Sequence, residues 1–168
     1  MLRIRKQHLA ITCAALATSW IGLGVSVAHA EYLTWGVKMQ PQIFGSSPEI
    51  VTLNQAPDGI LTVNVLKNTT VMINFSAECS VSETDFTSYA DINIEVQKPG
   101  TPYITVPPTN DDDAFCSSNG TSADDGRITT SRTVADTLLP GRNSIRVRAK
   151  TVGIGKTRLD DLSLLVSK

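Results

Sequence analysis

The sequence has no histidine after residue 29, and this absence excludes several kinds of site. Its two histidines are His8 and His29. Catalytic triads and Cys-His dyads need an imidazole that takes a proton near neutral pH. Blue-copper, haem and histidine-ligated zinc sites need the ring nitrogen of histidine. From residue 30 onward, the chain therefore offers the residues for none of these sites.

The first thirty residues have the pattern of a secretory signal peptide. Three of the first six residues are Arg or Lys, and 9–27 is uncharged and largely apolar. Ala28 and Ala30 are small residues at the two positions that signal peptidase reads. We predict cleavage after Ala30, export to the periplasm or the extracellular space, and no membrane span after cleavage. An uncleaved anchor is the alternative, because the apolar run approaches the ~20 residues that cross a bilayer.

Without that segment the chain is short of basic residues. The segment has three of the 15 Lys and Arg residues and no acid, which leaves 12 bases against 16 acids and a net charge of −4. Nucleic-acid binding needs clustered bases for phosphate contacts, so we expect no nucleic-acid partner. The remaining 138 residues have the length of one domain with a real hydrophobic core. We therefore predict a single β-sandwich domain over 31–168.

Only two cysteines remain after the predicted cleavage, Cys79 and Cys116. A pair of cysteines in an exported chain predicts one disulfide. It would close a loop that chain-entropy estimates credit with about 4 kcal/mol of stabilisation. Pairing would also exclude thiolate catalysis and cysteine-ligated zinc. Two buried free thiols are the alternative.

No segment has a sustained helical period, and apolar residues instead alternate with polar ones, as in half-buried β-strands. The clearest strand lies over 90–96, where Ala, Ile, Ile and Val alternate with Asp, Asn and Glu. Turn signals separate the candidate strands. The pattern predicts an all-β fold, a two-sheet antiparallel sandwich or jelly roll of eight or nine short strands. The other expected strands lie over 33–39, 50–53, 60–65, 71–79, 103–106, 128–134, 144–152 and 162–166.

Aromatic residues are scarce, at 5% of the chain. Sugar-binding sandwiches usually present an exposed aromatic platform, for which Trp35 and Tyr103 are the two candidates. Trp35 belongs with Leu33, Val37 and Met39 to one set of residues that alternates with polar or small ones, so the pattern places it in the core. An exposed coplanar pair of aromatics would favour sugar binding.

The polar stretch 109–126 contains the strongest candidate metal ligands. Calcium takes about six to eight oxygen ligands, which Asp side chains, Asn side chains and loop carbonyls supply. The spacing matches no EF-hand, and acid-rich surface loops are usually solvated. A calcium site and a solvated loop both remain open, and we expect no other cofactor. The candidate ligands are Asp111, Asp112, Asp113, Asp124 and Asp125.

Basic residues alternate along the expected strand 144–152, at Arg146, Arg148 and Lys150. Together with nearby arginines they would make a basic stripe for an acidic glycan. The alternative is a solvated strand face whose charges block edge pairing. The nearby arginines are Arg127, Arg132 and Arg142.

Several segments after residue 74 carry a resemblance to other proteins. They are 75–79 (FSAEC), 90–94 (ADINI), 107–108 (PP), 112–116 (DDAFC), 140–148 (PGRNSIRVR) and 159–164 (LDDLSL). In these segments the chain resembles a group of small exported bacterial proteins of unassigned function. The resemblance implies an all-β domain with Cys79 and Cys116 paired, and it transfers no catalytic residue. A weaker likeness, of pattern only, is to jelly rolls of the complement C1q and tumour-necrosis-factor type.

These patterns predict an exported structural or interaction module and not an enzyme. Its partner would be an unidentified protein or glycan, and homo-oligomers are compatible with the pattern. One alternative is a carbohydrate- or calcium-dependent binding domain centred on 111–125. The other is a carboxylate-based hydrolase, which needs two carboxylates about 5–10 Å apart across a sugar. Its candidate acids are Glu78, Glu83, Asp91 and Glu95, and none stands out in sequence.

Overall fold

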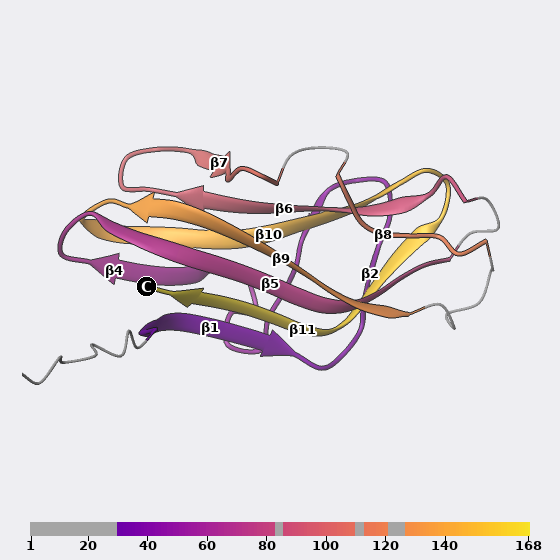
Figure 1. Cartoon of the computed structure of the whole chain (residues 1–168), viewed down its shortest axis with the longest axis horizontal. Helices are drawn as coiled ribbons and strands as arrows, with labels where there is room; N and C mark the ends of the chain where they lie inside the picture. Colours follow the sequence, from indigo (N-terminus) through magenta and orange to yellow (C-terminus); the bar gives the residue numbers. More distant parts are fainter. Residues whose placement is uncertain (1–29, 83–85, 110–112, 121–126) are drawn as a thin grey trace, which may run out of the picture.

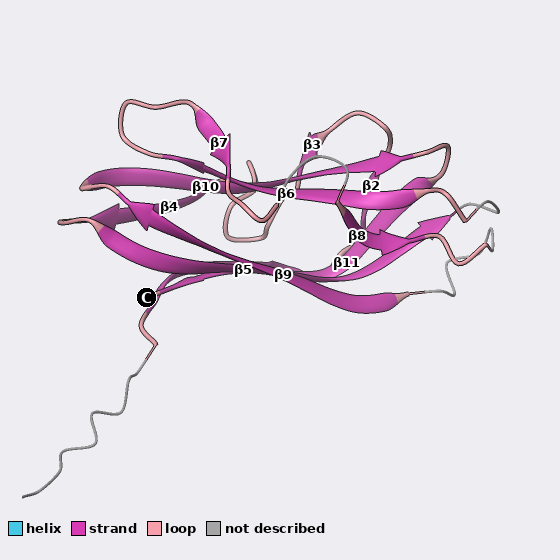
Figure 2. Cartoon of the chain, turned by 45° about the horizontal axis from the view of Figure 1, so that its top comes forward, coloured by secondary structure: helices cyan, strands magenta, loops and turns pink. Residues whose placement is uncertain are grey.

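The computed structural model describes residues 30–82, 86–109, 113–120 and 127–168, which form two antiparallel sheets packed face to face (Figure 1 and Figure 2). Sheet A contains, in order, β1 (Tyr32–Lys38), β11 (Lys156–Ser167), β5 (Thr69–Ser82) and β9 (Ile128–Leu138), with β2 (Gln42–Phe44) also paired to β11. Sheet B contains, in order, β3 (Glu49–Ile50), β10 (Gly141–Val152), β6 (Tyr89–Gln97) and β7 (Tyr103–Thr105). Two further strands join sheet B, β4 (Leu61–Val65) beside β10 and β8 (Ala114–Ser117) beside β6.

This architecture confirms the predicted all-β, two-sheet antiparallel sandwich. The described residues form eleven strands, against the eight or nine expected. Each expected range overlaps a strand, and the two strands that the sequence did not indicate are β2 and β8. Both are short, at three and four residues. The described residues include no helix with the length and apolar character that a membrane span requires.

The core lies between the sheets and follows the period-two pattern of the sequence. Along β5 the alternate residues from Val71 to Cys79 are buried, as are the alternate residues from Ala90 to Val96 on β6. Successive side chains of a strand point to opposite faces, so one face of each sheet supplies the core and the other remains available for function. Each fully buried Ile, Leu or Phe contributes about 1.5–3 kcal/mol to stability.

The predicted disulfide is confirmed and joins the two sheets. Cys79 lies on β5 of sheet A and Cys116 on β8 of sheet B, with their Cα atoms 6.2 Å apart. Both cysteines are buried. Phe115, next to Cys116, packs against Phe75 with ring centroids 5.6 Å apart. The disulfide therefore attaches the otherwise polar stretch around β8 to the core.

The prediction that Trp35 lies in the core is wrong. Its side chain is 53% exposed, and the buried residue of β1 is its neighbour Gly36. A Cβ added at Gly36 would lie 2.7 Å from Leu53 Cδ1 and 3.3 Å from Leu61 Cδ2. These leucines fill the interior against β1, so a residue of β1 that faces inward at this point must lack a side chain, and Gly36 meets that requirement. Trp35 consequently points outward from sheet A.

Candidate functional site

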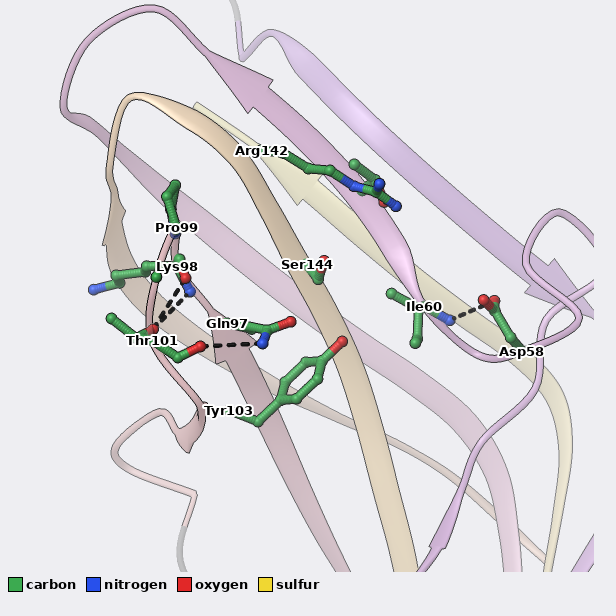
Figure 3. A pocket seen from close by; sticks show the side chains of 11 residues that line it. Asp58, Ile60, Gln97, Lys98, Pro99, Thr101, Tyr103, Arg142 and Ser144 are labelled. Atoms are coloured by element: carbon green, nitrogen blue, oxygen red, sulfur yellow. Dashed lines mark hydrogen bonds between the residues drawn. The ribbon is translucent and has the colours of Figure 1, made fainter.

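A cleft of about 550 Å³ opens on the outer face of sheet B, where β4, β10, β6 and β7 lie side by side (Figure 3). Its floor follows from the strand register. Ser144 on β10 lies opposite Thr62 on β4 and, on its other side, opposite Gln97 on β6. Gln97 lies opposite Tyr103 on β7. Directly paired residues share one face of a sheet, so two hydroxyls, an amide and a phenol form one row.

The turn between β6 and β7 makes one wall of the cleft. Thr101 N–H donates to Lys98 O at 3.0 Å, and Gly100 occupies the left-handed region at φ 75°, which favours glycine. Gln97 Nε2 donates to Thr101 O at 3.0 Å. This bond holds the amide nitrogen toward the turn and leaves the amide oxygen on the cleft side (Figure 3).

Tyr103 is held by a cationic side chain. The Arg146 guanidinium carbon lies 3.7 Å from the centroid of the Tyr103 ring. Arg146 is itself fixed, because its Nε donates to Glu95 Oε2 at 2.6 Å. A cation over a ring face contributes about 0.5–1 kcal/mol at an exposed site. The Tyr103 ring is therefore restrained by a side chain that is itself held in place.

The opposite wall carries one acid and one base. Arg142 Nη2 donates weakly to Thr62 Oγ1 at 3.5 Å, and Asp58 Oδ1 accepts from the Ile60 N–H at 3.1 Å. The third charged lining residue, Lys98, pairs with Asp136 at 2.9 Å. Asp58 is the one carboxylate among the described lining residues. The cleft is thus polar but nearly balanced in charge.

The six bases considered for a basic stripe do not share one surface. On the outer face of sheet B, Arg146 and Arg148 both pair with Glu95, at 2.6 and 3.5 Å, and Lys150 pairs with Asp91 at 3.2 Å. The Asp91 and Glu95 side chains are almost fully buried. Two other arginines belong to the part of the chain that borders sheet A: Arg127 lies near Glu78 and Asp160, and Arg132 pairs with Asp113.

The described candidate hydrolase acids also form ion pairs with basic side chains. Asp91 and Glu95 border a cavity of about 130 Å³ beside the cleft, but each is paired with bases of β10. Glu78 lies opposite Asp160 in sheet A, with Arg127 Nη1 3.9 Å from a carboxylate oxygen of each. Glu83 lies outside the described residues.

Of the candidate calcium ligands, only Asp113 belongs to the described residues. Its carboxylate accepts from Arg132 Nη1 at 3.2 Å. Among the described residues, no group of three His, Cys, Asp or Glu side chains is arranged to hold a metal ion. The calcium hypothesis stays a prediction, because four of its five residues lie outside the described residues: Asp111, Asp112, Asp124 and Asp125.

Sequence reasoning identified Tyr103 as a candidate platform residue but missed the other residues of the row. One feature of the sequence indicates that Thr62, Gln97 and Ser144 face outward, because each occupies a polar position of an alternating strand. That signal does not say which strands are neighbours. The order β4–β10–β6–β7 brings together residues up to 82 positions apart, and it is visible only in the sheet.

No protein-family model matches the sequence, and no curated protein matches it. Among solved structures, the chain is similar to a family 35 carbohydrate-binding module from Clostridium thermocellum. The two are 13% identical, the match covers 78% of this chain and 97% of that one, and the TM-score is 0.31.

Proposed function

We propose that this domain is a saccharide-binding module whose ligand lies in the cleft on sheet B. The observation that carries the proposal is the Tyr103 ring, which is fixed by Arg146 and set in a row of uncharged polar groups. Arg146 covers one face of the ring and does not itself line the cleft, whereas Tyr103 does. A sugar presents apolar C–H faces to such a ring and hydroxyls to the groups beside it.

The size and polarity of the cleft fit this kind of ligand. A volume of about 550 Å³ falls within the range of about 300–1,000 Å³ typical of small-molecule sites. Gln97, Thr62 and Ser144 offer an amide and two hydroxyls, and Arg142 adds a forked donor. A polyhydroxylated ligand satisfies several such groups at once, whereas an apolar ligand would desolvate them without replacement.

The charge distribution favours binding over hydrolysis. Glycoside hydrolysis in its usual form requires two carboxylates on either side of the bond that breaks. Among the described lining residues, the cleft offers Asp58 alone. We therefore propose a non-catalytic module that holds a saccharide without cleaving it.

We place the function outside the cytoplasm. The Cys79–Cys116 disulfide is of the kind that persists in oxidising compartments. Together with the signal-peptide pattern of the first thirty residues, it supports export, and the mature chain would begin at Glu31. Intact mass spectrometry of exported material tests this: a retained leader would contradict it.

The binding proposal is tested with a panel of soluble oligosaccharides and isothermal titration calorimetry. Tyr103→Ala should weaken binding of the best ligand at least tenfold, a loss of about 1.4 kcal/mol or more. Ile104→Ala is the matched control, because Ile104 is the next residue of β7 and does not line the cleft. Failure of every saccharide to bind, or equal binding by the two variants, would contradict the proposal.

A further inference from the structure

The outer face of sheet A carries two exposed aromatic side chains on its edge strand β1. Trp35 is 53% exposed and Tyr32 is 66% exposed. In a regular strand, residues three apart point to opposite faces. A β-bulge between Tyr32 and Thr34 changes this, so that Tyr32 lies opposite Ser167 and Trp35 opposite Leu165. Ser167 and Leu165 are two apart on β11, so both aromatics belong to the same face.

This face continues across the sheet without charge. Ser167 lies opposite Met72 on β5, and Met72 lies opposite Ala135 on β9. Leu165 lies opposite Asn74, whose Nδ2 donates to Thr133 Oγ1 at 2.6 Å. The next row is uncharged as well and consists of Val37, Ser163, Ser76 and Ser131. The face thus has an aromatic edge followed by uncharged side chains, most of which carry hydroxyl or amide groups. We call these three rows the sheet A platform.

The platform is held in place at the chain end where it begins. Glu31 and Lys168 exchange both backbone hydrogen bonds, each at 2.9 Å, and their side chains form an ion pair at 2.9 Å. Tyr32 is therefore anchored although it lies one residue beyond the predicted first residue of the mature chain. Aromatic groups that are ordered before binding lose less entropy when a ligand arrives.

We propose that the sheet A platform is a second binding surface, which takes the flat, uncharged face of an extended polysaccharide. The register separates Tyr32 and Trp35 by two residues along β11, about 7 Å, so both aromatics can contact one extended chain. Sugar rings of that chain stack on the two aromatics, and their hydroxyls meet the Ser, Thr and Asn side chains beyond. The absence of charge from these rows matches a neutral polymer and offers nothing to an anionic one.

The area of the patch favours a polysaccharide over a second copy of this chain. Large aromatic side chains bury about 150–250 Å² when covered completely, and these two are already partly covered. A stable protein dimer buries about 800 Å² on each partner. The most exposed large apolar side chains of the platform, Tyr32, Trp35 and the 47% exposed Met72, supply only part of that area, and most of the remaining platform residues are small and polar.

The platform is independent of the cleft, because the cleft lies on the outer face of sheet B and the platform on the outer face of sheet A. Figure 2 shows these two sheets as separate layers. A domain with both surfaces would hold a soluble saccharide end on one side and a polymer surface on the other. The second surface stands or falls separately from the proposed function, since each has its own aromatic residue to remove.

The test is sedimentation of the disulfide-bonded 31–168 chain with microcrystalline cellulose and with chitin. Trp35→Ala should lower the partition coefficient at least tenfold, while Tyr103→Ala should leave it unchanged. Ile154→Ala is the control for loss of an exposed apolar side chain, because Ile154 is 79% exposed and lies between β10 and β11, near the end of β11 that is remote from Ser167. Thermal melting confirms that each variant is folded.

Trp35 supplies a second readout. The other tryptophan, Trp20, lies in the predicted signal peptide, so emission from the mature chain reports on Trp35 alone. Binding of a polysaccharide should shift its emission to shorter wavelength. Failure of the chain to sediment with either polymer would overturn the proposal. So would self-association in analytical ultracentrifugation that Trp35→Ala abolishes, because it would show that a second copy covers the platform.

Discussion

The two outer faces of the sandwich differ in chemistry although the same alternating pattern builds both. The face of sheet B has charged pairs between β10 and β6 beside a polar cleft, whereas the platform rows of sheet A have no charge. The inward faces of both sheets are apolar. The comparison shows that alternation determines the core, while the outward residues and the strand order determine what each surface can bind.

The disulfide gives the largest expected effect, and it tests whether the two faces depend on one shared framework. Replacing both Cys79 and Cys116 with Ala should lower the free energy of unfolding by about 4 kcal/mol, because the unfolded chain regains the entropy of the closed loop. Urea titration measures the loss. In the unsubstituted chain the disulfide joins β5 to β8, so both sheets should unfold in one transition. Separate unfolding transitions for the cleft and the platform in that chain would contradict the shared framework.

Removal of Glu95 should give a somewhat smaller effect and should act on sheet B. Glu95 is 9% exposed and pairs with both Arg146 and Arg148. Glu95→Ala leaves two partly buried guanidinium groups without their carboxylate, and we expect a loss of about 3 kcal/mol. It also releases Arg146 from behind Tyr103, so saccharide affinity in the cleft should fall.

The matched control for Glu95 is Asn74→Ala on the platform, where the lost hydrogen bond to Thr133 is exposed. Its cost should stay near 1 kcal/mol or less. Urea titration measures both losses. Equal losses for the two substitutions would contradict the expectation that the charged pairs of sheet B contribute more to stability than the exposed hydrogen bond of sheet A.

A substitution at Gly36 should cost less stability than removal of Glu95, and it should act on sheet A instead of sheet B. Gly36→Val places a branched side chain against Leu53 and Leu61, and overpacking of this kind costs about 1–3 kcal/mol. The strain should displace β1 and weaken polysaccharide binding by the platform. Binding in the cleft should weaken less, because no residue of β1 lines the cleft, although Leu61 lies between the lining residues Ile60 and Thr62. An equal loss of both activities at a temperature where the variant is folded would contradict the independence of the two surfaces.

The sequence predicted those elements whose own residues alternate between apolar and polar over a long enough stretch to indicate a strand. The strands β5, β6 and β10 alternate over many residues, and the cysteine count predicted the pair Cys79–Cys116. β8 was not indicated because its four residues are ordered by β6 and by the disulfide, and not by a period of their own. Trp35 was placed on the wrong face because hydrophobicity does not show that Leu53 and Leu61 occupy the interior against β1.

The candidate site was less predictable than the fold. Tyr103 could be named from its type, but its partners depend on pairings between distant strands, such as Thr62 with Ser144 and Ser144 with Gln97. The ion pairs of β10 have the same origin, because nothing in the local sequence brings Glu95 between Arg146 and Arg148.

The measurement that tests the central claim most directly is amide chemical-shift mapping of the folded 31–168 chain during titration with its best soluble saccharide. The account predicts that the largest shifts occur at the row Thr62, Ser144, Gln97 and Tyr103 and in the turn at Thr101. Shifts confined to other surfaces, with this row unchanged at saturation, would contradict the assignment of the cleft as the saccharide site.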